Sequence, residues 1–542
     1  MSKVPFIYWQ KHKKNPLICF FHFQYQKPMA TAFDFADYCY IFLFWIIATL
    51  LVNSFIKRCA NFRSNARHPP GPPALPIIGH LHLLSARLPT SLEALAKRYG
   101  PLMQIRIGTS TFLVVSDTSL AKEILKTHDV DFASKYVFGP QQHSIYKDDS
   151  FINCPYGTYW RFMKKLCVTR LFAGPQIDRF IDIREQETLK LLKSLLDRAS
   201  KGEASDLSME LSSLTNNLIC RMAMGKKWSE NPNLSIEIRN LVRNIMGSGA
   251  KLGFTEVFGP LKRFDISGYG KKLREALWSF DGVLEQIMRD YEKNEMKGSE
   301  KEERDVMDIL LETYRDKKAE VKLTREQIKF FFLELFLAGV DTTSAAILWA
   351  MTELINHPQV SKKLRVEIES VVGSSRLVKE SDVPNLPYLQ AVIKETLRLH
   401  PPGALLRRQC HHDCKLGGFD IKQGTKILIN SYAIMRDPKI WDEPEKFLPE
   451  RFLNNSGDQT FEQMGTKGQD FRFLPFGSGR RSCIGQPHAS IVLHGTIGSL
   501  IQCFDWKLKD GEKADVQVVK GYAGAVAHSL VCYPITHFDP FN

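Results

Sequence analysis

Several patterns that define other protein classes are missing from this sequence. It has no zinc-finger spacing, RNA-recognition motif or basic repeat, so the formal net charge of +14 over 542 residues does not indicate nucleic-acid binding. It also has no Rossmann glycine fingerprint or P-loop, so electrons for any redox reaction would have to come from another protein. The 11 cysteines are scattered singly, which is typical of a reducing compartment rather than of a disulfide framework. We interpret the cluster Cys410–Cys414 as incidental, because adjacent residues rarely converge on one tetrahedral metal ion.

Long hydrophobic runs are scarce, and residues 38–56 form the one uncharged apolar span of its length. Such a span can cross a hydrocarbon core of ~30 Å as a helix, and it is longer than the apolar part of a cleaved signal peptide. Asp34 and Asp37 precede it, whereas Lys57 and Arg58 follow. The positive-inside rule therefore predicts a single-pass transmembrane anchor with the C-terminal bulk in the cytoplasm.

The segments around this span differ in composition. Residues 1–28 carry lysines but no acidic residue, and the chain restarts with Met29, so we interpret residues 1–28 as a doubtful N-terminal extension. Residues 57–76 are basic and proline-rich, which predicts a stiff hinge because proline resists helix. A hydrophobic fraction of 44% is enough for one large core, so residues 77–542 are expected to form a single domain.

The most informative stretch surrounds Cys483. Phe476, Gly479, Arg481, Cys483 and Gly485 have the spacing Phe-x-x-Gly-x-Arg-x-Cys-x-Gly, and an apolar helical pattern follows. A cysteine just before a helix lies among free backbone N–H groups, which favour the thiolate. We expect the two glycines to supply positive φ and a close approach to a flat ligand, and Arg481 to reach an anionic group. A core cysteine in a Gly/Ser loop is the ordinary alternative, but this spacing is far more specific.

A second unusual stretch lies inside a long helical pattern over residues 327–354. Ala338, Asp341 and Thr342 surround a glycine in its middle, although glycine, acids and β-branched hydroxyl residues are unfavourable or neutral in an apolar helix. A threonine hydroxyl can bend such a helix, and an adjacent acid and alcohol can pass protons. The charges of Glu334 and Asp341 argue against a transmembrane helix here.

Two further pairs share helix faces. Trp160 and Lys164 are four residues apart, and a half-buried tryptophan beside a solvated lysine is the ordinary interpretation. Glu395 and Arg398 are three apart, with Arg451 downstream. Surface ion pairs of this kind are common and stabilise a helix by only ~0.3–0.5 kcal/mol.

Strand patterns are short and few. Residues 102–107 and 111–115 predict a hairpin, and residues 416–419 and 425–430 suggest another. From Leu120 onward the pattern is mostly helical.

Taken together, these motifs resemble those of the cytochrome P450 (haem-thiolate) monooxygenases, and they stand in that family's order. The phrases Asn385–Gln390 and Tyr432–Pro438 are similar to the plant specialised-metabolism branch. The resemblance implies a mainly α fold with small β-sheets, the cytochrome P450 fold, behind a transmembrane helix. It also implies haem b with an axial thiolate from Cys483 and insertion of one oxygen atom of O2 into a C–H bond.

The resemblance further implies an endoplasmic reticulum membrane protein that receives electrons from NADPH through a membrane-bound flavoprotein reductase. We expect that reductase to dock on a basic face that includes Lys164, Lys165 and Arg480. Plant members usually have proline directly after the cysteine and a small residue directly after Gly485. This sequence instead has Ile484 and Gln486 at these positions, and Pro487 is expected in the first helical turn.

Residue roles follow from the same resemblance. It assigns proton delivery to Asp341 and Thr342, and a structural lock to Glu395, Arg398 and Arg451. The implied haem-binding residues are Trp160, Lys164, Arg408, Phe476, Gly479, Arg481 and Gly485. The implied substrate-lining residues are Phe331, Leu335, Ala338, Ala404, Leu405, Leu406, Ala525 and Val526. Arg407 stands where a small or apolar residue is more usual, which leaves open which of the two arginines binds the haem.

The lining residues are apolar, so a large and poorly polar substrate is expected. The resemblance favours a pentacyclic triterpenoid such as friedelin, oxidised at a methyl group. A flavonoid or isoflavonoid is the first alternative, although its phenols would want polar partners. A haem-thiolate isomerase or dehydratase that does not use O2 is the second, and the Asp341–Thr342 pair argues against it. A membrane-bound haem sensor is the third, but a sensor needs no proton relay.

Overall fold

The computed structural model describes residues 40–42, 44–45, 48–49, 52, 68–136, 144–146, 150–229, 232–253, 265, 268–296, 304–453, 470–509 and 529–542. The chain forms two compact units, Met1–Ser64 and Asn65–Asn542. Residues 1–28 and Met29 lie outside the described residues, and the expected anchor is described at only a few positions, all of them helical. Within the described residues, α11 (Arg325–Asn356) alone is long and apolar enough to cross a membrane, and most of it is buried in the protein.

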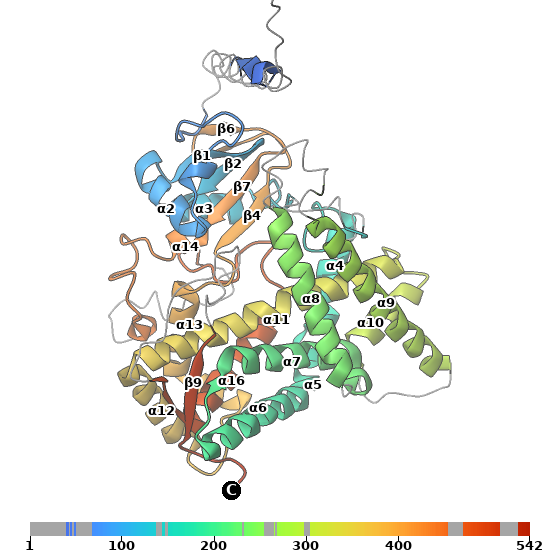
Figure 1. Cartoon of the computed structure of the whole chain (residues 1–542), viewed down its shortest axis with the longest axis vertical. Coiled ribbons are helices and arrows are strands. Elements are labelled where there is room, and N and C mark those ends of the chain that lie inside the picture. Colours follow the sequence, from blue (N-terminus) through green and yellow to red (C-terminus); the bar gives the residue numbers. More distant parts are fainter. Residues whose placement is uncertain are drawn as a thin grey trace, which may run out of the picture. The chain divides into compact units, whose positions relative to one another are not determined.

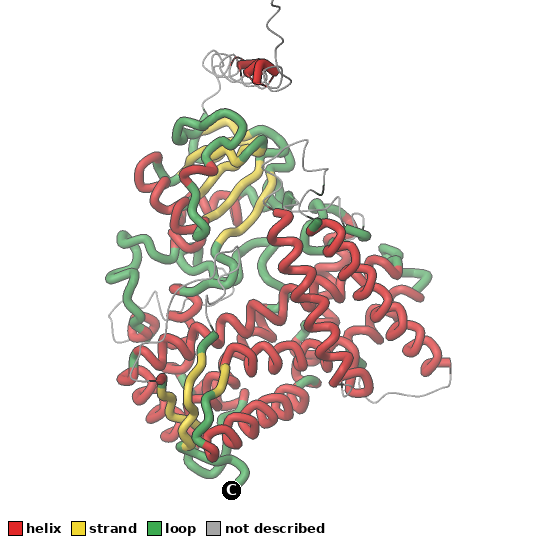
Figure 2. Tube along the Cα trace, viewed as in Figure 1, coloured by secondary structure: helices red, strands yellow, loops and turns green. Residues whose placement is uncertain are grey.

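The second unit is mainly helical, with its strands gathered in small sheets (Figures 1 and 2). Besides α11, its α-helices are α2 (Leu88–Tyr99), α3 (Thr118–Lys122), α4 (Thr158–Leu166), α5 (Gly174–Arg179), α6 (Ile181–Lys201), α7 (Leu207–Ser229), α8 (Pro232–Gly253), α9 (Tyr269–Met296), α10 (Val306–Arg315), α12 (Pro358–Val372), α13 (Pro387–Leu399), α14 (Ser431–Ile434) and α16 (Gln486–Cys503). Short 3-10 or π turns include η2 (Glu123–Thr127), η6 (Glu380–Asn385) and η7 (Pro449–Phe452).

The long central helix was predicted from its pattern, and α11 confirms the prediction. It starts where the Thr324 hydroxyl accepts a hydrogen bond from the Gln327 amide and the Gln327 side chain accepts one from the Thr324 amide, which forms a capping box. It ends just before Pro358, which disfavours helix at the preceding residue. Apolar residues lie all round it because α7, α13 and α16 pack against it. It therefore forms the centre of the helical region (Figure 1).

The main sheet has the strand order β1-β2-β7-β4, made of β1 (Leu102–Ile107), β2 (Ser110–Val115), β7 (Lys426–Asn430) and β4 (Leu405–Gln409). The first predicted hairpin is confirmed, with β1 antiparallel to β2. The second is corrected: β5 (Cys414–Leu416) pairs with β6 (Phe419–Ile421) around Gly417 and Gly418, both at positive φ. β7 instead runs parallel to β2 and antiparallel to β4. A third sheet joins β3 (Ser205–Asp206), β9 (Val531–Thr536) and β8 (Phe504–Lys507).

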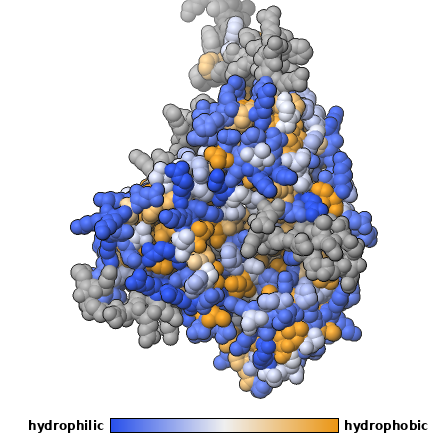
Figure 3. Space-filling view, turned by 180° about the vertical axis from the view of Figure 1, so that it is seen from behind, coloured by the Kyte–Doolittle hydropathy of each residue, from blue (hydrophilic) through white to orange (hydrophobic). Residues whose placement is uncertain are grey.

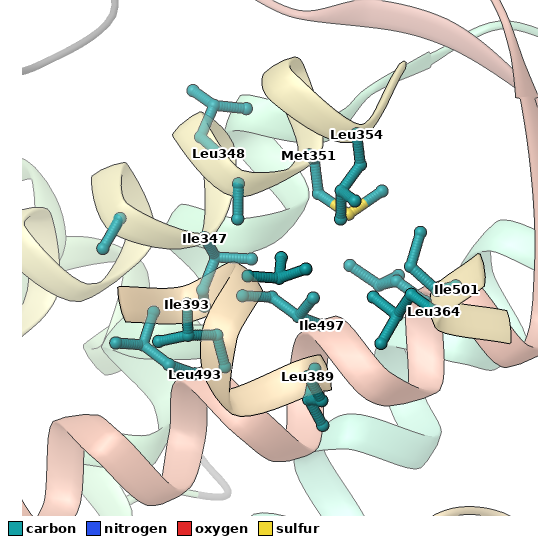
Figure 4. Packing of buried hydrophobic residues seen from close by; sticks show 14 of the residues in the cluster. Ile347, Leu348, Met351, Leu354, Leu364, Leu389, Ile393, Leu493, Ile497 and Ile501 are labelled. Carbon is teal, nitrogen blue, oxygen red and sulfur yellow. The ribbon is translucent and has the colours of Figure 1, made fainter. Parts of the chain in front are cut away.

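The largest apolar cluster joins four helices from distant parts of the chain. Figure 4 shows side chains of α11, α12, α13 and α16 meeting in it, among them Ile347, Met351, Leu364, Leu389, Ile393, Ile497 and Ile501. Apolar residues also reach the surface in patches on the face shown in Figure 3, which is otherwise largely hydrophilic. Because α16 is fixed in this core, the loop that precedes it, with Cys483, is fixed as well.

Behind that loop lies a buried ion network. The Glu395 carboxylate of α13 accepts hydrogen bonds from Arg398 at 2.7 and 2.9 Å and from Arg451 of η7 at 3.1 Å. Glu395 and Arg398 have no exposed surface. Arg398 also donates to the carbonyl of Met435 at 2.9 Å, and the Met435 sulfur accepts from the Leu474 amide at 3.4 Å. The pair that looks like a surface pair in the sequence therefore joins α13 to the segment that leads into the Cys483 loop.

Replacing Glu395 by glutamine should strongly destabilise the fold, because Arg398 and Arg451 would lose the charge that compensates theirs. Breaking a buried ion pair in this way costs roughly 3–5 kcal/mol. The free energy of unfolding would be measured by urea denaturation followed by circular dichroism. Glu369→Gln is the matched control, since that carboxylate is 45% exposed and pairs with His537 at the surface, and it should change stability by less than about 1 kcal/mol. Equal effects of the two substitutions would contradict this role of the network.

Candidate active site

The loop around Cys483 is closed by its own backbone. The Cys483 amide donates to the Phe476 carbonyl at 3.0 Å, and the Ser482 amide donates to the Gly479 carbonyl at 3.0 Å. Gly477 and Gly479 have φ of 70° and 72°. A Cβ at Gly479 would lie 2.5 Å from the carbonyl oxygen of Leu125 in η2. Gly479 therefore has the positive φ and the close approach that its sequence position predicted, although it approaches backbone here.

The prediction of positive φ at Gly485 was wrong. Its φ is −84°, and it stands at the N-cap of α16 with Pro487 in the first turn. A Cβ at Gly485 would lie 4.0 Å from the Cys483 sulfur. The glycine at this position therefore keeps space open next to the sulfur rather than permitting a left-handed turn.

The Cys483 side chain is exposed, although the segments on both sides of its loop are well packed. Although Cys483 has accessible surface, the protein around its sulfur excludes enough solvent to raise the pKa of the thiol, and the amides of Gly485 and Gln486 together with Lys164 oppose that rise. The amides at the start of α16 therefore favour the thiolate, as the sequence predicted, although desolvation is the larger effect in the protein chain by itself. A bound metal ion would reverse the balance, since coordination deprotonates a thiol outright.

Cationic and aromatic side chains surround the same loop. Lys164 of α4 donates to the Ser482 carbonyl at 3.1 Å, and Arg408 of β4 donates to the Ser478 carbonyl at 3.1 Å. Arg481 donates to the Ala133 carbonyl at 2.6 Å, and its guanidinium lies 4.5 Å from the centre of the Trp160 ring. The structure thus brings four of the predicted haem-binding residues, Trp160, Lys164, Arg408 and Arg481, to one loop.

The two neighbouring arginines of β4 point different ways. Arg408 is 2% exposed, and burial next to Arg481 lowers its pKa to about 10. Arg407 instead donates to the side-chain oxygen of Asn153 at 3.1 Å. Because side chains alternate along a strand, only one of the two can face the loop. Arg408 is the one that contacts it.

One face of α11 is accessible although most of the helix is buried. Ala338 is exposed, and Leu335 and Thr342 are half-buried. Leu335 packs against the same apolar cluster as Ile484, the residue after Cys483. Phe331, by contrast, is 2% exposed and packs against Phe151 at a ring distance of 6.1 Å. The accessible face is therefore apolar at Leu335 and Ala338 and ends at the Thr342 hydroxyl.

The unusual residues of α11 have separate local explanations. The Thr342 hydroxyl donates to the Ala338 carbonyl, yet the helix continues through this point. Partial burial raises the pKa of Asp341, and Arg243 of α8 opposes the rise. A Cβ at Gly339 would lie 2.9 Å from the Ile219 side chain, so the glycine lets α7 approach α11 closely.

The remaining predicted lining residues divide into three groups. Leu406 lies beside the loop, with its side chain 3.5 Å from where a Cβ of Gly477 would stand. Leu405 is buried in the core of the main sheet, and Ala404 is 7% exposed at its end. Ala525 and Val526 lie outside the described residues.

Two acids that sequence reasoning did not assign hold the site together. The Glu334 carboxylate of α11 accepts from the amides of Phe151 at 2.9 Å and Ile152 at 3.1 Å and from the Ser150 hydroxyl. Asp129 accepts from the Arg480 amide at 3.2 Å. A buried acid in an apolar helix needs hydrogen-bond partners, which was a usable signal for Glu334.

These residues fit a haem. The exposed Cys483 sulfur would provide the thiolate ligand, and Arg408 and Arg481 are buried cations suited to the carboxylates of the macrocycle. The fold and the site define a haem-thiolate protein. The comparisons with known proteins specify the family: the cytochrome P450 family model matches residues 69–525, and the chain belongs to this family.

Relatives and solved structures agree with this assignment. The chain is 41% identical over 516 residues to cytochrome P450 705A22 of Arabidopsis thaliana, covering 94% of this chain and 99% of the relative. It is 40% identical to beta-amyrin 24-hydroxylase of Glycine max (94% and 99% covered) and 39% identical to 3,9-dihydroxypterocarpan 6A-monooxygenase of the same species (92% and 99%). A zebra fish cytochrome P450 structure with progesterone matches with a TM-score of 0.70 and 26% identity, covering 82% of this chain and 99% of that one.

The protein is thus a plant cytochrome P450 of the CYP705/CYP93 type and a monooxygenase of plant specialised metabolism. The predicted fold class is confirmed. The family uses haem-thiolate chemistry, O2 and electrons from a reductase, as the sequence predicted.

Substituting Gly479 by alanine should reduce haem incorporation several-fold, because the new Cβ would collide with the Leu125 carbonyl at an unfavourable φ. The measurement is the ferrous–CO difference spectrum per amount of folded chain. Gly495→Ala in α16 is the matched control, since a Cβ there meets no atom within 4 Å, and it should keep the full band. An undiminished band in the Gly479 variant would contradict the steric argument.

Glu334 should make stability depend on pH. Burial raises its pKa to about 7 from 4.5. Between these values the folded chain binds a proton that the unfolded chain has released, so the stabilising contribution is complete below pH 4.5 and is lost as pH rises through 7. The slope is at most about 1.4 kcal/mol per pH unit.

Glu334→Gln removes this titration. The melting temperature of the variant minus that of the parent should therefore increase as pH rises from about 5 to 8. Thermal unfolding across that pH series would show it. Glu312→Gln serves as the surface control, because that carboxylate is 49% exposed. Parallel pH profiles of the Glu334 variant and the parent would contradict the raised pKa.

Proposed function

We propose that this monooxygenase inserts one oxygen atom of O2 into a C–H bond of a pentacyclic triterpenoid such as friedelin. In this proposal residues 38–56 anchor the chain in the endoplasmic reticulum membrane, residues 57–76 form the hinge, and residues 77–542 form the catalytic domain in the cytoplasm. Residues 1–28 are a doubtful N-terminal extension in this proposal.

The observation that carries the substrate class is the accessible face of α11. Leu335 and Ala338 offer apolar surface next to the Thr342 hydroxyl, and the chain places Leu406 beside the Cys483 loop. A large apolar skeleton is bound by apolar walls with few polar groups. The 40% identity to a beta-amyrin 24-hydroxylase, whose name specifies a triterpenoid, supports the same class.

The proposed residue roles follow from the geometry. Cys483 supplies the axial thiolate, Phe476, Gly479 and Gly485 shape its loop, and Trp160, Lys164, Arg408 and Arg481 hold the carboxylates of the haem. Ala404 and Leu405 are buried, so they support the residues that line the substrate site and do not contact the substrate themselves.

When bound, the haem supplies the oxygen activation, and the protein positions the substrate and moves protons. The Thr342 hydroxyl, which donates to the Ala338 carbonyl, can turn to donate toward the accessible face. Partial burial raises the pKa of Asp341 above its usual range, which makes its carboxyl better suited to pass a proton. These two groups are the proposed proton carriers.

The proposed reductase surface includes Lys165 and Arg480, which are both exposed near the Cys483 loop. Lys164 is half-buried and already donates to Ser482, so its contribution to docking is smaller. An acidic reductase surface would be attracted to this basic face.

An isoflavonoid substrate is the second candidate, favoured by the 39% identity to a pterocarpan 6A-monooxygenase. Its phenolic groups would require polar partners, and the accessible part of α11 offers the Thr342 hydroxyl and the exposed Asp341 carboxyl beside the apolar Leu335 and Ala338. An isomerase or dehydratase that does not use O2 would have no use for the Asp341–Thr342 pair.

The test is reconstitution of the full chain in microsomes with a plant NADPH-dependent reductase. Friedelin and β-amyrin would be offered beside isoflavonoids, with ¹⁸O2 and mass spectrometry of the products. We expect NADPH-dependent incorporation of one ¹⁸O atom into a triterpenoid. Oxidation of isoflavonoids alone would overturn the substrate class, and turnover without NADPH would overturn the monooxygenase role.

Ala338→Leu should sharpen this test. Added bulk on the accessible face should lower kcat/KM for the triterpenoid by about tenfold or more while the ferrous–CO band is retained. Ala199→Leu, near the end of α6, carries the same change away from the site and should leave turnover unchanged. Equal kcat/KM in both variants would remove Ala338 from the substrate wall.

A further inference from the structure

A cavity that none of these roles uses lies between helices α6, α7 and α16. Its volume is about 180 Å³, and its walls include Arg184 and Thr188 of α6, Leu218 of α7 and Thr496 of α16. Residues 377–380, which lead into η6, form another wall. Among the described residues, none of those that line it belongs to α11 or β4, so the cavity is separate from the candidate active site.

Bonds between the walls hold this cavity in shape. Two nitrogens of the Arg184 guanidinium donate to the Glu380 carboxylate of η6, one of them at 2.7 Å, and both residues line the cavity. The Val378 amide donates to the side-chain oxygen of Gln502 in α16 at 2.9 Å. Helices α6 and α16 also contact each other (Figure 1). Because α6, η6 and α16 are joined in this way, the cavity is formed before any ligand arrives.

Two buried residues of α16 that line the cavity carry hydroxyls. Thr496 and Ser499 are each 2% exposed, and neither side chain forms a hydrogen bond with the other described residues. Buried threonines in other helices differ, since Thr313 of α10 and Thr396 of α13 donate to the carbonyl four residues earlier at 2.7 and 2.8 Å. A buried hydroxyl without a partner is unfavourable, so this pair indicates a polar group inside the cavity.

Most of the remaining lining is apolar. Leu189, Leu218 and Val492 contribute aliphatic side chains, whereas Glu185 and Lys379 are exposed and mark the side that opens to solvent. An apolar cavity of about 150 Å³ holds one benzene molecule. The cavity between α6 and α16 therefore has room for one six-membered ring with small substituents.

We propose that this cavity is a second ligand site and that it binds a single-ring compound with a hydroxyl group, such as a phenol. The ring packs against the aliphatic side chains, and the ligand hydroxyl donates to one of Thr496 and Ser499 and accepts from the other. These residues are three apart and share a helix face, which suits a group that both donates and accepts. Because α16 begins at Gln486, the ligand contacts the helix that follows the Cys483 loop. The inference does not depend on the proposed triterpenoid.

The test uses the full-length haem protein with its active site filled by a bulky azole that ligates the iron and is too large for the cavity. Two probes of nearly the same shape, 4-fluorophenol and 4-fluorotoluene, would be titrated and followed by ¹⁹F NMR. We expect saturable binding of 4-fluorophenol. Thr496→Val keeps the side-chain shape and removes the hydroxyl, so it should weaken 4-fluorophenol about tenfold without weakening 4-fluorotoluene, as expected for one lost hydrogen bond.

Thr313→Val is the matched control, because that hydroxyl is buried but donates within its own helix, and it should leave both affinities unchanged. Leu377→Phe adds bulk to the wall and should abolish binding of both probes. If Thr496→Val does not fold, Ser499→Ala replaces it in every comparison.

Three results would overturn the proposal. Absence of saturable 4-fluorophenol binding would leave water as the occupant of the cavity. Equal weakening of both probes by Thr496→Val would assign the effect to the shape of the wall and not to its hydroxyl. Unchanged binding to Leu377→Phe would place the probes elsewhere on the protein.

Discussion

The site depends on guanidinium groups that donate to backbone carbonyls. Arg481 reaches the carbonyls of Ala133, Phe151, Ile152 and Cys154, and Arg408 reaches that of Ser478. An arginine with five fixed donors can satisfy several carbonyls of irregular backbone at once, which a lysine cannot do. The loops around Cys483 have little regular secondary structure of their own, so these bonds take the place of a helix or sheet in positioning them.

The same contacts connect the two sides of the site. Glu334 holds the amides of Phe151 and Ile152 from α11, and the carbonyls of those two residues accept from Arg481 on the Cys483 loop. One short segment thus lies between the helix that carries Thr342 and the loop that carries Cys483. A shift of that segment would move both the helix and the loop, since the amides of Phe151 and Ile152 are bonded to Glu334 and their carbonyls to Arg481. This arrangement explains why a carboxylate is placed in a helix that is otherwise apolar at this point.

Sequence reasoning predicted the elements with local signals and missed those whose reason lies far along the chain. Helix α11 and the β1–β2 hairpin have periodicity, caps and turns that are visible within a few residues. The pairing of β7 with β2 joins strands about three hundred residues apart, and no local pattern indicates it. Asp129 was missed for the same reason, because its partner Arg480 lies on the Cys483 loop, about 350 residues further along the chain. Gly485 was mispredicted because a glycine can be required for space as well as for positive φ, and only the structure separates these two uses.

The electrostatics of the chain by itself are unfavourable at two points, and one ligand relieves both. Loss of solvent around the Cys483 sulfur raises the pKa of its thiol, while burial and the neighbouring Arg481 lower the pKa of Arg408. A haem held by Cys483, Arg408 and Arg481 would supply the opposite charge at each place, with its iron cation for the sulfur and its carboxylates for the arginines. Binding free energy of the haem is therefore also folding free energy for the segments before Tyr136 and around Cys483, as it is in other metal sites whose ligands are held at a cost. The same substitutions should therefore change both the stability of these loops and the retention of haem. The core of α11, α13 and α16 is stabilised by apolar packing, so its stability should not change with them.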